Sequence, residues 1–290
     1  MSTRRCHSVL CTQVVRVCVC AGLLFVCRLS VAQLPPNPDQ PLNEKLATHV
    51  TIRVVGHGSL ALGREVGGAK VTITDLETGQ LLATGLQQGE AGDQNLIMRT
   101  PHVMREPVYS SAPSAAFTTT LYLDAPTRVE IAAQGPMGYP ISAQRVAHTT
   151  WLIPGQHMSG DGVVLELYGY LVRIEAPPEG ESLIAKEDVT LRASVRTLAG
   201  TPVQPHGDWD ARSVSIFGEV MIGGRVIERL QMFFSGERSV FEAPFFVPTA
   251  HDAPDGITLR VVAANAADGN VGVAEANYPV LTERLRPNNR

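Results

Sequence analysis

The stretch Val189-Thr190-Leu191-Arg192-Ala193-Ser194-Val195-Arg196 alternates apolar and polar side chains without a break. Because successive side chains of a strand point to opposite faces, this pattern predicts a strand with one face in a core and the other in water. The same period recurs nearby, between turn sequences such as Asp268-Gly269-Asn270, in the segments Val214–Ile222, Val240–Val247, Ile257–Ala264 and Val271–Val280. About seven short strands at this spacing favour an immunoglobulin-like β-sandwich over residues 163–282. The cysteine pair and the tryptophan between them that mark antibody-type domains are missing.

Alternation also dominates the chain before this region, beginning near His49. Val50, Ile52 and Val54 share one face, and the pair Val71 and Ile73 is followed by a turn over 76–79 and a return run over 81–84. This order predicts a β-hairpin. The pattern recurs at 121–123 and 129–133, and no stretch of helical period and useful length follows residue 32. We therefore expect an all-β fold with two tandem β-sandwiches.

A family resemblance is carried by short segments of the first sandwich. They are Gly68-Ala69-Lys70-Val71-Thr72-Ile73-Thr74-Asp75, Thr78-Gly79, Ala83-Thr84-Gly85, Val129-Glu130-Ile131-Ala132-Ala133 and Gly138-Tyr139. Over about 90 residues this part resembles the carboxypeptidase regulatory-like, or transthyretin-like, modules. The resemblance implies a small prealbumin-like sandwich that serves as an accessory, binding or spacing module. The Tyr-Arg-Gly-Ser tetrad of the hydrolytic transthyretin relatives is absent, and a long insertion over 87–117 departs from the family pattern.

The boundary between the two sandwiches is expected between Gln156 and Val163, where Pro154-Gly155 and Ser159-Gly160-Asp161-Gly162 form a turn-rich segment. The first sandwich then covers 48–158 and the second 163–282, with a proline-rich linker over 33–47 and a tail over 283–290. An alternative hinge is Pro177-Pro178-Glu179-Gly180. With that hinge, Val163–Ile174 is instead the last strand of the first sandwich.

Residues 1–32 have the pattern of a signal peptide. The apolar run over 17–27 is 11 residues long, and every formal charge in this stretch is an arginine: Arg4, Arg5, Arg16 and Arg28. A membrane span needs about 20 apolar residues, so this run is too short. Ser30-Val31-Ala32 has small residues where a signal peptidase cuts, and we expect cleavage after Ala32 and export to the periplasm or the extracellular space. The alternative is an interrupted helix over 9–32 that is retained as an anchor.

The leader also contains all five cysteines, Cys6, Cys11, Cys18, Cys20 and Cys27. A mature chain therefore has no disulfide, no thiolate zinc site and no cysteine nucleophile. Without the leader, 20 of the 24 basic residues remain against 28 acidic ones, a net charge of −8, and three of those 20 are lysines. This balance disfavours nucleic acid as a partner. We expect no membrane span once the leader is removed.

Histidine and methionine are the candidate metal ligands of such a thiol-free chain, and copper is the metal that they suit. The side chains considered are His49, His57, His102, His148, His157, His206, His251, Met98, Met104, Met137 and Met158. Met98, His102 and Met104 lie close in sequence, as do His157 and Met158. No His-x-His or Met-x-x-Met repeat is present, so chance spacing is favoured and we assign no metal and no cofactor.

Paired acids in turns are a second candidate ligand set, here for calcium: Asp252 with Asp255, Asp208 with Asp210, and Asp268 with Asn270. None has the spacing of an EF-hand, and such residues beside glycine are first of all turn formers. The sequence has no Gly-x-Ser-x-Gly elbow, and nothing in it places Ser59 near His157. Gly56-His57-Gly58 lacks the spacing of a phosphate-binding loop, and Glu179 and Glu181 lie in a solvated turn. We expect no catalytic site and no enzymatic activity.

The insertion over 87–117 is the first place to look for function, because a long connection in a small domain is usually a binding loop or disordered. It contains apolar and basic side chains, Ile97, Met98, Val103, Met104, Val108, Tyr109, Arg99 and Arg105. It either binds a partner or packs on its own domain as a hairpin. The segment from Trp151 to His157 is the second place to look. The expected function is that of a non-catalytic binding, assembly or accessory protein with a protein partner in a cell-envelope or extracellular complex. A copper-handling protein is the alternative.

Overall fold

The computed structural model describes residues 44–103, 106–110 and 113–282. The predicted leader, the tail over 283–290, most of the linker and Met104 lie outside these ranges. In the described part the fold is all-β, as predicted, with one short helix, α1 (Gln94–Arg99), and three single 3-10 turns, η1 (Arg64–Val66), η2 (Pro140–Ser142) and η3 (Ala211–Ser213). Strand structure begins at Leu46, three residues before the predicted start at His49. No helix in these ranges is both long and apolar enough to cross a bilayer.

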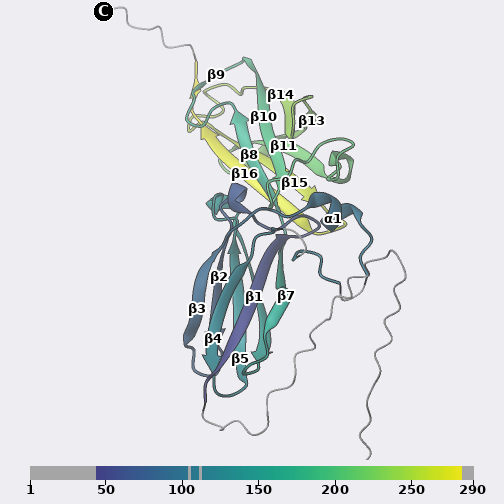
Figure 1. Cartoon of the computed structure of the whole chain (residues 1–290). Coiled ribbons are helices and arrows are strands. Elements are labelled where there is room, and N and C mark those ends of the chain that lie inside the picture. Colours follow the sequence, from purple (N-terminus) through teal and green to yellow (C-terminus); the bar gives the residue numbers. More distant parts are fainter. Residues whose placement is uncertain (1–43, 104–105, 111–112, 283–290) are drawn as a thin grey trace, which may run out of the picture. The chain divides into compact units, whose positions relative to one another are not determined.

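The first sandwich pairs a sheet of order β4-β1-β7 with a sheet of order β3-β2-β5-β6 (Figure 1). Its strands are β1 (Leu46–Gly56), β2 (Ala69–Asp75), β3 (Leu81–Gln87), β4 (Phe117–Leu123), β5 (Thr127–Gly135), β6 (Gln144–Leu152) and β7 (Met158–Leu167). The predicted hairpin is confirmed, because Val71 lies opposite Gly85 and Ile73 opposite Ala83. The inward residues Ile52, Ile73 and Ile131 are fully buried between the sheets.

The second sandwich pairs a sheet of order β13-β14-β10-β8 with a sheet of order β12-β11-β15-β16. Its strands are β8 (Tyr170–Ala176), β10 (Asp188–Thr197), β11 (Ser215–Ile222), β12 (Arg225–Gln231), β13 (Phe233–Phe234), β14 (Val240–Phe246), β15 (Ile257–Asn265) and β16 (Asn270–Tyr278). Two short strands, β9 (Leu183–Ile184) and β17 (Val280–Leu281), pair with each other in parallel. The predicted runs around 189–195, 214–222, 240–247, 257–264 and 271–280 are thus confirmed as strands.

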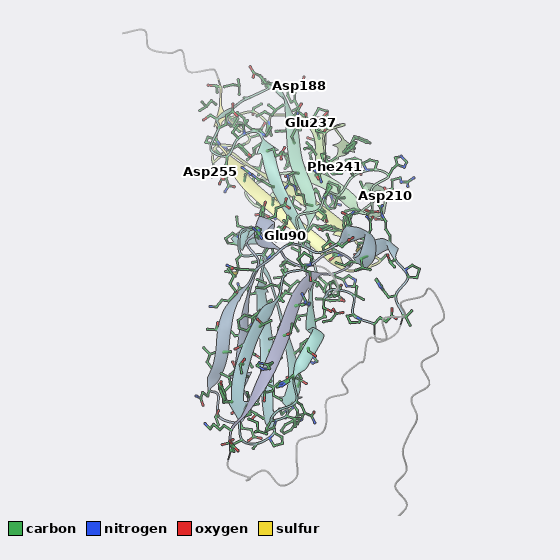
Figure 2. The ribbon with its side chains drawn as sticks, viewed as in Figure 1. Glu90, Asp188, Asp210, Glu237, Phe241 and Asp255 are labelled. Atoms are coloured by element: carbon green, nitrogen blue, oxygen red, sulfur yellow. The ribbon has the colours of Figure 1, made fainter. Side chains whose placement is uncertain are left out.

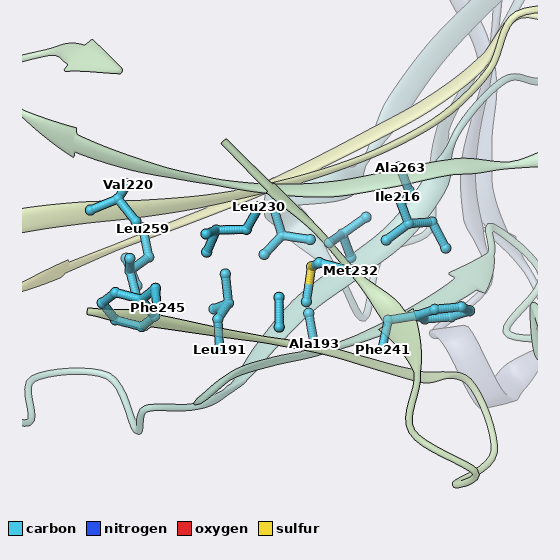
Figure 3. Packing of buried hydrophobic residues seen from close by; sticks show 14 of the residues in the cluster. Leu191, Ala193, Ile216, Val220, Leu230, Met232, Phe241, Phe245, Leu259 and Ala263 are labelled. Atoms are coloured by element: carbon cyan, nitrogen blue, oxygen red, sulfur yellow. The ribbon is translucent and has the colours of Figure 1, made fainter. Parts of the chain in front are cut away.

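The core of the second sandwich follows the predicted alternation. Leu191 and Ala193 of β10 point inward and meet Leu259 and Val220 from the facing sheet, with Met232 between the layers (Figure 3). Gly218 belongs to the inward row of β11, and a Cβ there would lie 2.7 Å from a Leu191 methyl carbon. Close packing of this kind explains why the row contains a glycine.

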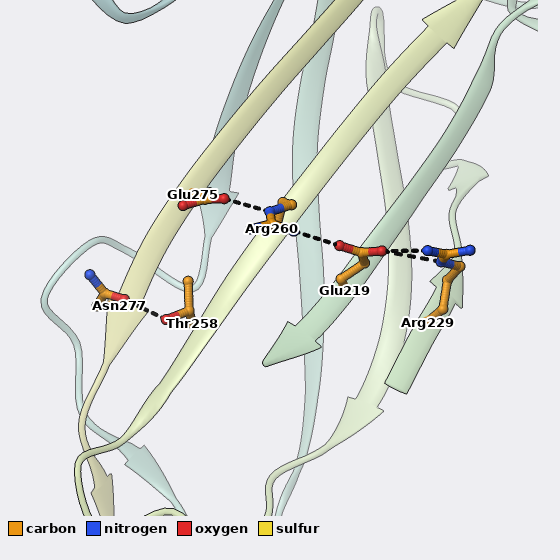
Figure 4. Close-up of polar contacts among 6 residues, drawn as sticks. All are labelled: Glu219, Arg229, Thr258, Arg260, Glu275 and Asn277. Carbon is orange, nitrogen blue, oxygen red and sulfur yellow. Dashed lines mark hydrogen bonds and ion pairs between the residues drawn. The ribbon is translucent and has the colours of Figure 1, made fainter. Parts of the chain in front are cut away.

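The outer face of the β12-β11-β15-β16 sheet carries a row of alternating charge (Figure 4). Glu219 of β11 lies opposite Arg229 of β12 and Arg260 of β15, and Arg260 lies opposite Glu275 of β16. Glu219 accepts from Arg229 Nη2 at 2.7 Å and from Arg260 Nη1 at 3.1 Å, although its side chain is only 6% exposed. The Arg229 guanidinium also lies 4.8 Å over the Phe217 ring.

The predicted boundary between the sandwiches, at 156–163, is placed too early. β7 pairs with β1 as far as Leu167, so the segment from Val163 onward still belongs to the first sandwich. β8 begins at Tyr170 and pairs with β10 of the second sandwich. The mostly apolar segment from Val163 to Ile174 hides this change of sheet, which occurs at Tyr168-Gly169. The alternative hinge at Pro177 is placed too late, because β8 lies before Pro177 and already pairs with β10 of the second sandwich. Both sandwiches belong to one compact unit.

Candidate binding surface at the junction of the sandwiches

The insertion over 87–117 begins on a buried anchor, Gln87. Its amide nitrogen donates to the carbonyls of Val54 at 2.8 Å and Leu62 at 3.1 Å, and its amide oxygen accepts from the Val54 N–H at 2.6 Å. The side chain is fully buried. Since a buried amide without partners is costly, this set of bonds fixes where the insertion leaves the first sandwich.

The insertion then covers the outer face of β1 and β7. The Asp161 carboxylate accepts from three successive backbone N–H groups, those of Val108, Tyr109 and Ser110, at 2.7, 2.9 and 2.7 Å. Arg53 is buried below the insertion, and its Nη1 donates to Ser114 Oγ at 2.7 Å. Burial lowers the pKa of Arg53, and the charge of Asp161 opposes this effect. Of the two alternatives left open by the sequence, the insertion packs on its own domain, and it contains a helix and not a strand hairpin.

Helix α1 joins the insertion to the second sandwich. Asp93 caps its first turn by accepting from the N–H groups of Asn95 and Leu96. Arg99 at its other end donates through Nε and Nη2 to the Asp208 carboxylate at 3.0 and 2.8 Å. The buried Ile97 packs with Leu60 and Ala199, with Trp209 alongside. The insertion thus contacts both sandwiches and links them through an ion pair and an apolar contact.

Further hydrogen bonds fix the junction itself. The Gly169 N–H donates to Asn270 Oδ1 at 2.8 Å, and the Ser59 hydroxyl donates to Thr197 Oγ1 at 2.9 Å. Gly169 has φ +152, and a Cβ there would lie 3.2 Å from the Val271 carbonyl oxygen. Only glycine meets both conditions without strain. The chain between β7 and β8 is therefore held tightly against β16.

A groove of about 480 Å³ lies beside this junction. It is lined by Ile141, Ser142, Gln144, Tyr168, Tyr170, Gly269, Val271, Gly272 and Val273. Four of its apolar side chains face solvent: Ile141 is 93% exposed, and Tyr168, Val271 and Val273 are 48%, 49% and 41% exposed. A contiguous group of exposed apolar side chains is typical of a surface that binds another molecule.

Two tyrosines give the groove polar groups of fixed position. The Tyr168 ring stacks on His57 with 4.1 Å between centroids, and His57 Nδ1 lies 2.8 Å from Glu166 Oε2. Burial, and then the charge of Asp268, raises the pKa of Tyr170 to about 12. A hydrogen bond with the Asn265 side chain opposes this rise.

The structure brings together two of the histidine candidates, His49 and His157. Met98 packs in the cluster around Ile97, and His102 Nε2 lies 3.0 Å from the Ile97 carbonyl oxygen. His157 meets His49, with 4.5 Å between ring centroids and a 3.2 Å hydrogen bond from the His49 N–H to His157 Nδ1. Within the described residues, no three His, Cys, Asp or Glu side chains are grouped as a metal site requires.

The acidic turn residues bond their own turns or neighbouring side chains. Asp208 pairs with Arg99, and Asp210 pairs with Arg212, which lowers the pKa of Asp210 to about 2. Asp268 accepts from Asn265 Nδ2 and the Asn270 N–H. Asp252 accepts from the Thr249 hydroxyl. Figure 2 shows Asp210 near α1 and Asp255 in the second sandwich, far from each other.

The remaining candidates for catalysis also have structural partners. Ser59 is buried and bonds Thr197. Burial raises the pKa of Tyr278, as do the charges of Glu179 and Glu181, so these carboxylates lie near that side chain.

Trp151, in the second predicted segment, is 51% exposed on β6. The groove residues Ile141 and Tyr168 were not singled out by the sequence patterns, because neither belongs to a motif.

No family model matches the chain, and no curated protein matches it. Among solved structures, it is similar to the fibronectin(III)-like modules of Clostridium thermocellum CbhA, with 11% identity, 87% of this chain and 98% of that chain covered, and a TM-score of 0.26. It is also similar to a chimeric titin Z1Z2-Z1Z2 tandem, with 12% identity, 82% of this chain and 92% of that chain covered, and a TM-score of 0.23. A third similar structure is Dpr2 Ig1-Ig2 in complex with DIP-Theta Ig1-Ig3, with 11% identity, 81% of this chain and 100% of that chain covered, and a TM-score of 0.24. Likenesses with such TM-scores carry no argument about function. The two-sandwich description rests on the strand pairing above.

Proposed function

We propose that this chain is an exported, non-catalytic binding or accessory protein that engages a protein partner in a cell-envelope or extracellular complex. The observation that carries the proposal is the group of exposed apolar side chains Ile141, Tyr168, Val271 and Val273 around one groove. Burying such side chains against a partner contributes about 25 cal/mol for each Å² removed from water. The signal-peptide pattern of residues 1–32 supports export.

The geometry of the junction supports the same proposal. The groove is built from residues of both sandwiches, and the bonds of Gly169, Ser59 and Arg99 hold them in one arrangement. A surface fixed before binding loses less conformational freedom on association than a mobile loop does. In this proposal the insertion links the two sandwiches that form the groove and is not itself the partner-binding loop.

Site-specific photocrosslinking in the producing organism tests this function. A photoreactive residue in place of Ile141 is expected to give a discrete adduct of one mass, identified by mass spectrometry. The matched control is Leu81, which is 53% exposed in the β2–β3 hairpin and does not line the groove. The same adduct from Leu81, or no adduct from Ile141, would overturn the proposal.

A further inference from the structure

The second sandwich has an open sheet edge at the start of β10. The pairing of β8 with β10 runs from Tyr170 opposite Thr197 to Ala176 opposite Arg192 and ends there. β10 itself begins four residues earlier, at Asp188, where its other neighbour β14 is still paired with it. Within the described residues, no strand lies beside 188–191 on the β8 side. Figure 2 shows Asp188 in the second sandwich, at a distance from Glu90 of the insertion.

Printed hydrogen bonds fix which backbone groups face this open edge. The Val247 N–H donates to the Glu187 carbonyl at 3.0 Å, and the Val195 N–H donates to the Ser239 carbonyl at 2.8 Å. The backbone groups of residues 187 and 195 therefore point to the β14 side. Because the direction alternates along a strand, the N–H and C=O groups of Asp188 and Thr190 point to the side that β8 has left.

A groove of about 600 Å³ occupies this place. Its lining residues are Ala176, Pro177, Pro178, Glu181, Ser182, Leu183, Ile184, Glu187, Val189, Thr190 and Leu281. Seven of the eleven lining residues are apolar, and the charged side chains in the lining, Glu181 and Glu187, are both carboxylates. The sequence without its leader carries a net charge of −8, which adds a long-range attraction for cations.

We propose that this edge groove binds a short, extended, cationic peptide segment of a partner protein by strand addition to β10. The backbone of the segment pairs with Asp188 and Thr190, its alternate side chains contact the apolar lining residues, and its lysine or arginine side chains face Glu181. Four residues of a strand span about 13 Å, the length of the stretch 188–191 that has β14 on one side and no strand on the β8 side. The proposal deepens the binding function above, and it uses a surface separate from the junction groove.

Two synthetic eight-residue peptides with blocked ends test the proposal against the purified exported protein: one alternates valine and arginine, and the other alternates valine and glutamate. The first is expected to bind and to slow amide hydrogen exchange at Asp188 and Thr190. The second is expected to bind at least tenfold more weakly. Equal affinity for the two peptides, or binding without protection of those two amides, would overturn the proposal.

Matched variants separate the charges of the groove from the charge of the whole protein. Glu181→Gln is expected to weaken binding of the arginine peptide about fivefold. The control, Glu228→Gln, removes the same charge from an exposed site outside the groove and is expected to change affinity less than twofold. Equal losses in the two variants would contradict site-specific recognition. Thr190→Pro removes an N–H that faces the groove, and it is expected to abolish both binding and the protection of Asp188.

The same measurements distinguish other occupants and the proposed function. Protection of Asp188 and Thr190 without peptide, if it disappears on dilution, would assign the groove to a second copy of the chain. Protection that persists on dilution would assign it to the chain itself. Either result would overturn the peptide proposal. Ile141→Asp is expected to leave peptide affinity unchanged, so loss of the junction adduct and loss of peptide binding are separate failures.

Discussion

Replacing Glu219 with glutamine is expected to destabilise the second sandwich by about 2 kcal/mol. The side chain of Glu219 is 6% exposed and accepts from two arginines, whose side chains are 66% and 31% exposed. Glutamine keeps the shape but removes the charge, so the charge-assisted bonds become ordinary ones and two cations flank a neutral amide. The partial exposure of the arginines keeps the cost below the 3–5 kcal/mol typical of a fully buried pair.

Urea unfolding measures this loss of free energy. The chain has two tryptophans, Trp151 in β6 and Trp209 before β11, so emission in a Trp151→Phe background reports on Trp209, whose indole N–H bonds the Gly58 carbonyl at the junction. The control is Glu275→Gln, at the exposed end of the same row, which is expected to cost less than 1 kcal/mol. Equal costs for the two variants, or a cost under about 0.5 kcal/mol for Glu219→Gln, would refute the reasoning.

The same row predicts a pH dependence of stability. Hydrogen bonds from Arg229, and then from Arg260, hold the pKa of Glu219 below its ordinary value of 4.5 against the opposing effect of burial. The unfolded state therefore binds the proton more readily than the folded state. The contribution of Glu219 is present above pH 4.5 and is lost as the pH falls through the lower pKa of the folded state. The difference between the native chain and Glu219→Gln is expected to shrink over that range.

Three other perturbations test the junction and the metal hypothesis. Asp161→Ala removes the acceptor of three N–H groups and is expected to cost about 2 kcal/mol and to speed hydrogen exchange at residues 108–110; unchanged exchange there would contradict the docking of the insertion. Gly169 has φ +152, and a Cβ there would lie 3.2 Å from the Val271 carbonyl oxygen, whereas Gly160 has φ +68 and a Cβ there would meet nothing within 4 Å. Gly169→Ala is therefore expected to lower the free energy of unfolding more than Gly160→Ala does, and the reverse order in thermal unfolding would refute the junction geometry. Copper titration of the purified protein is expected to show no binding tighter than roughly micromolar, and a tighter site lost in His157→Ala would revive the copper alternative.

Alternation predicted most strands of this fold because a half-buried strand must place apolar residues on one face. It was informative at β10, where Leu191 and Ala193 are buried and Arg192 reaches solvent. It failed at the boundary, since the segment from Val163 to Ile174 is mostly apolar both in the strand that ends one sandwich and in the strand that begins the next. Pairing partners, which the local pattern does not encode, decide that division.

The candidate surface was harder to predict for a related reason. In β16 the larger residues Val271 and Val273 face outward, and Gly272 and Ala276 face the core. Alternation gives the period of this strand but not which row is inside. The inward position 272 is a glycine because a Cβ there would lie 2.5 Å from the Tyr170 carbonyl oxygen. Ile141 is a single apolar residue in a 3-10 turn, and its exposure becomes informative only beside residues far away in sequence.

The most direct test of the binding account is the affinity of the purified protein for the partner that the Ile141 crosslink identifies. Ile141→Asp and Val273→Asp are expected to raise Kd at least tenfold while thermal unfolding stays unchanged, because each places a charge in the apolar contact. Leu81→Asp is expected to leave Kd within twofold of the native value. An unchanged Kd for both groove variants, or an equal loss in Leu81→Asp, would contradict the assignment of the junction groove as the binding surface.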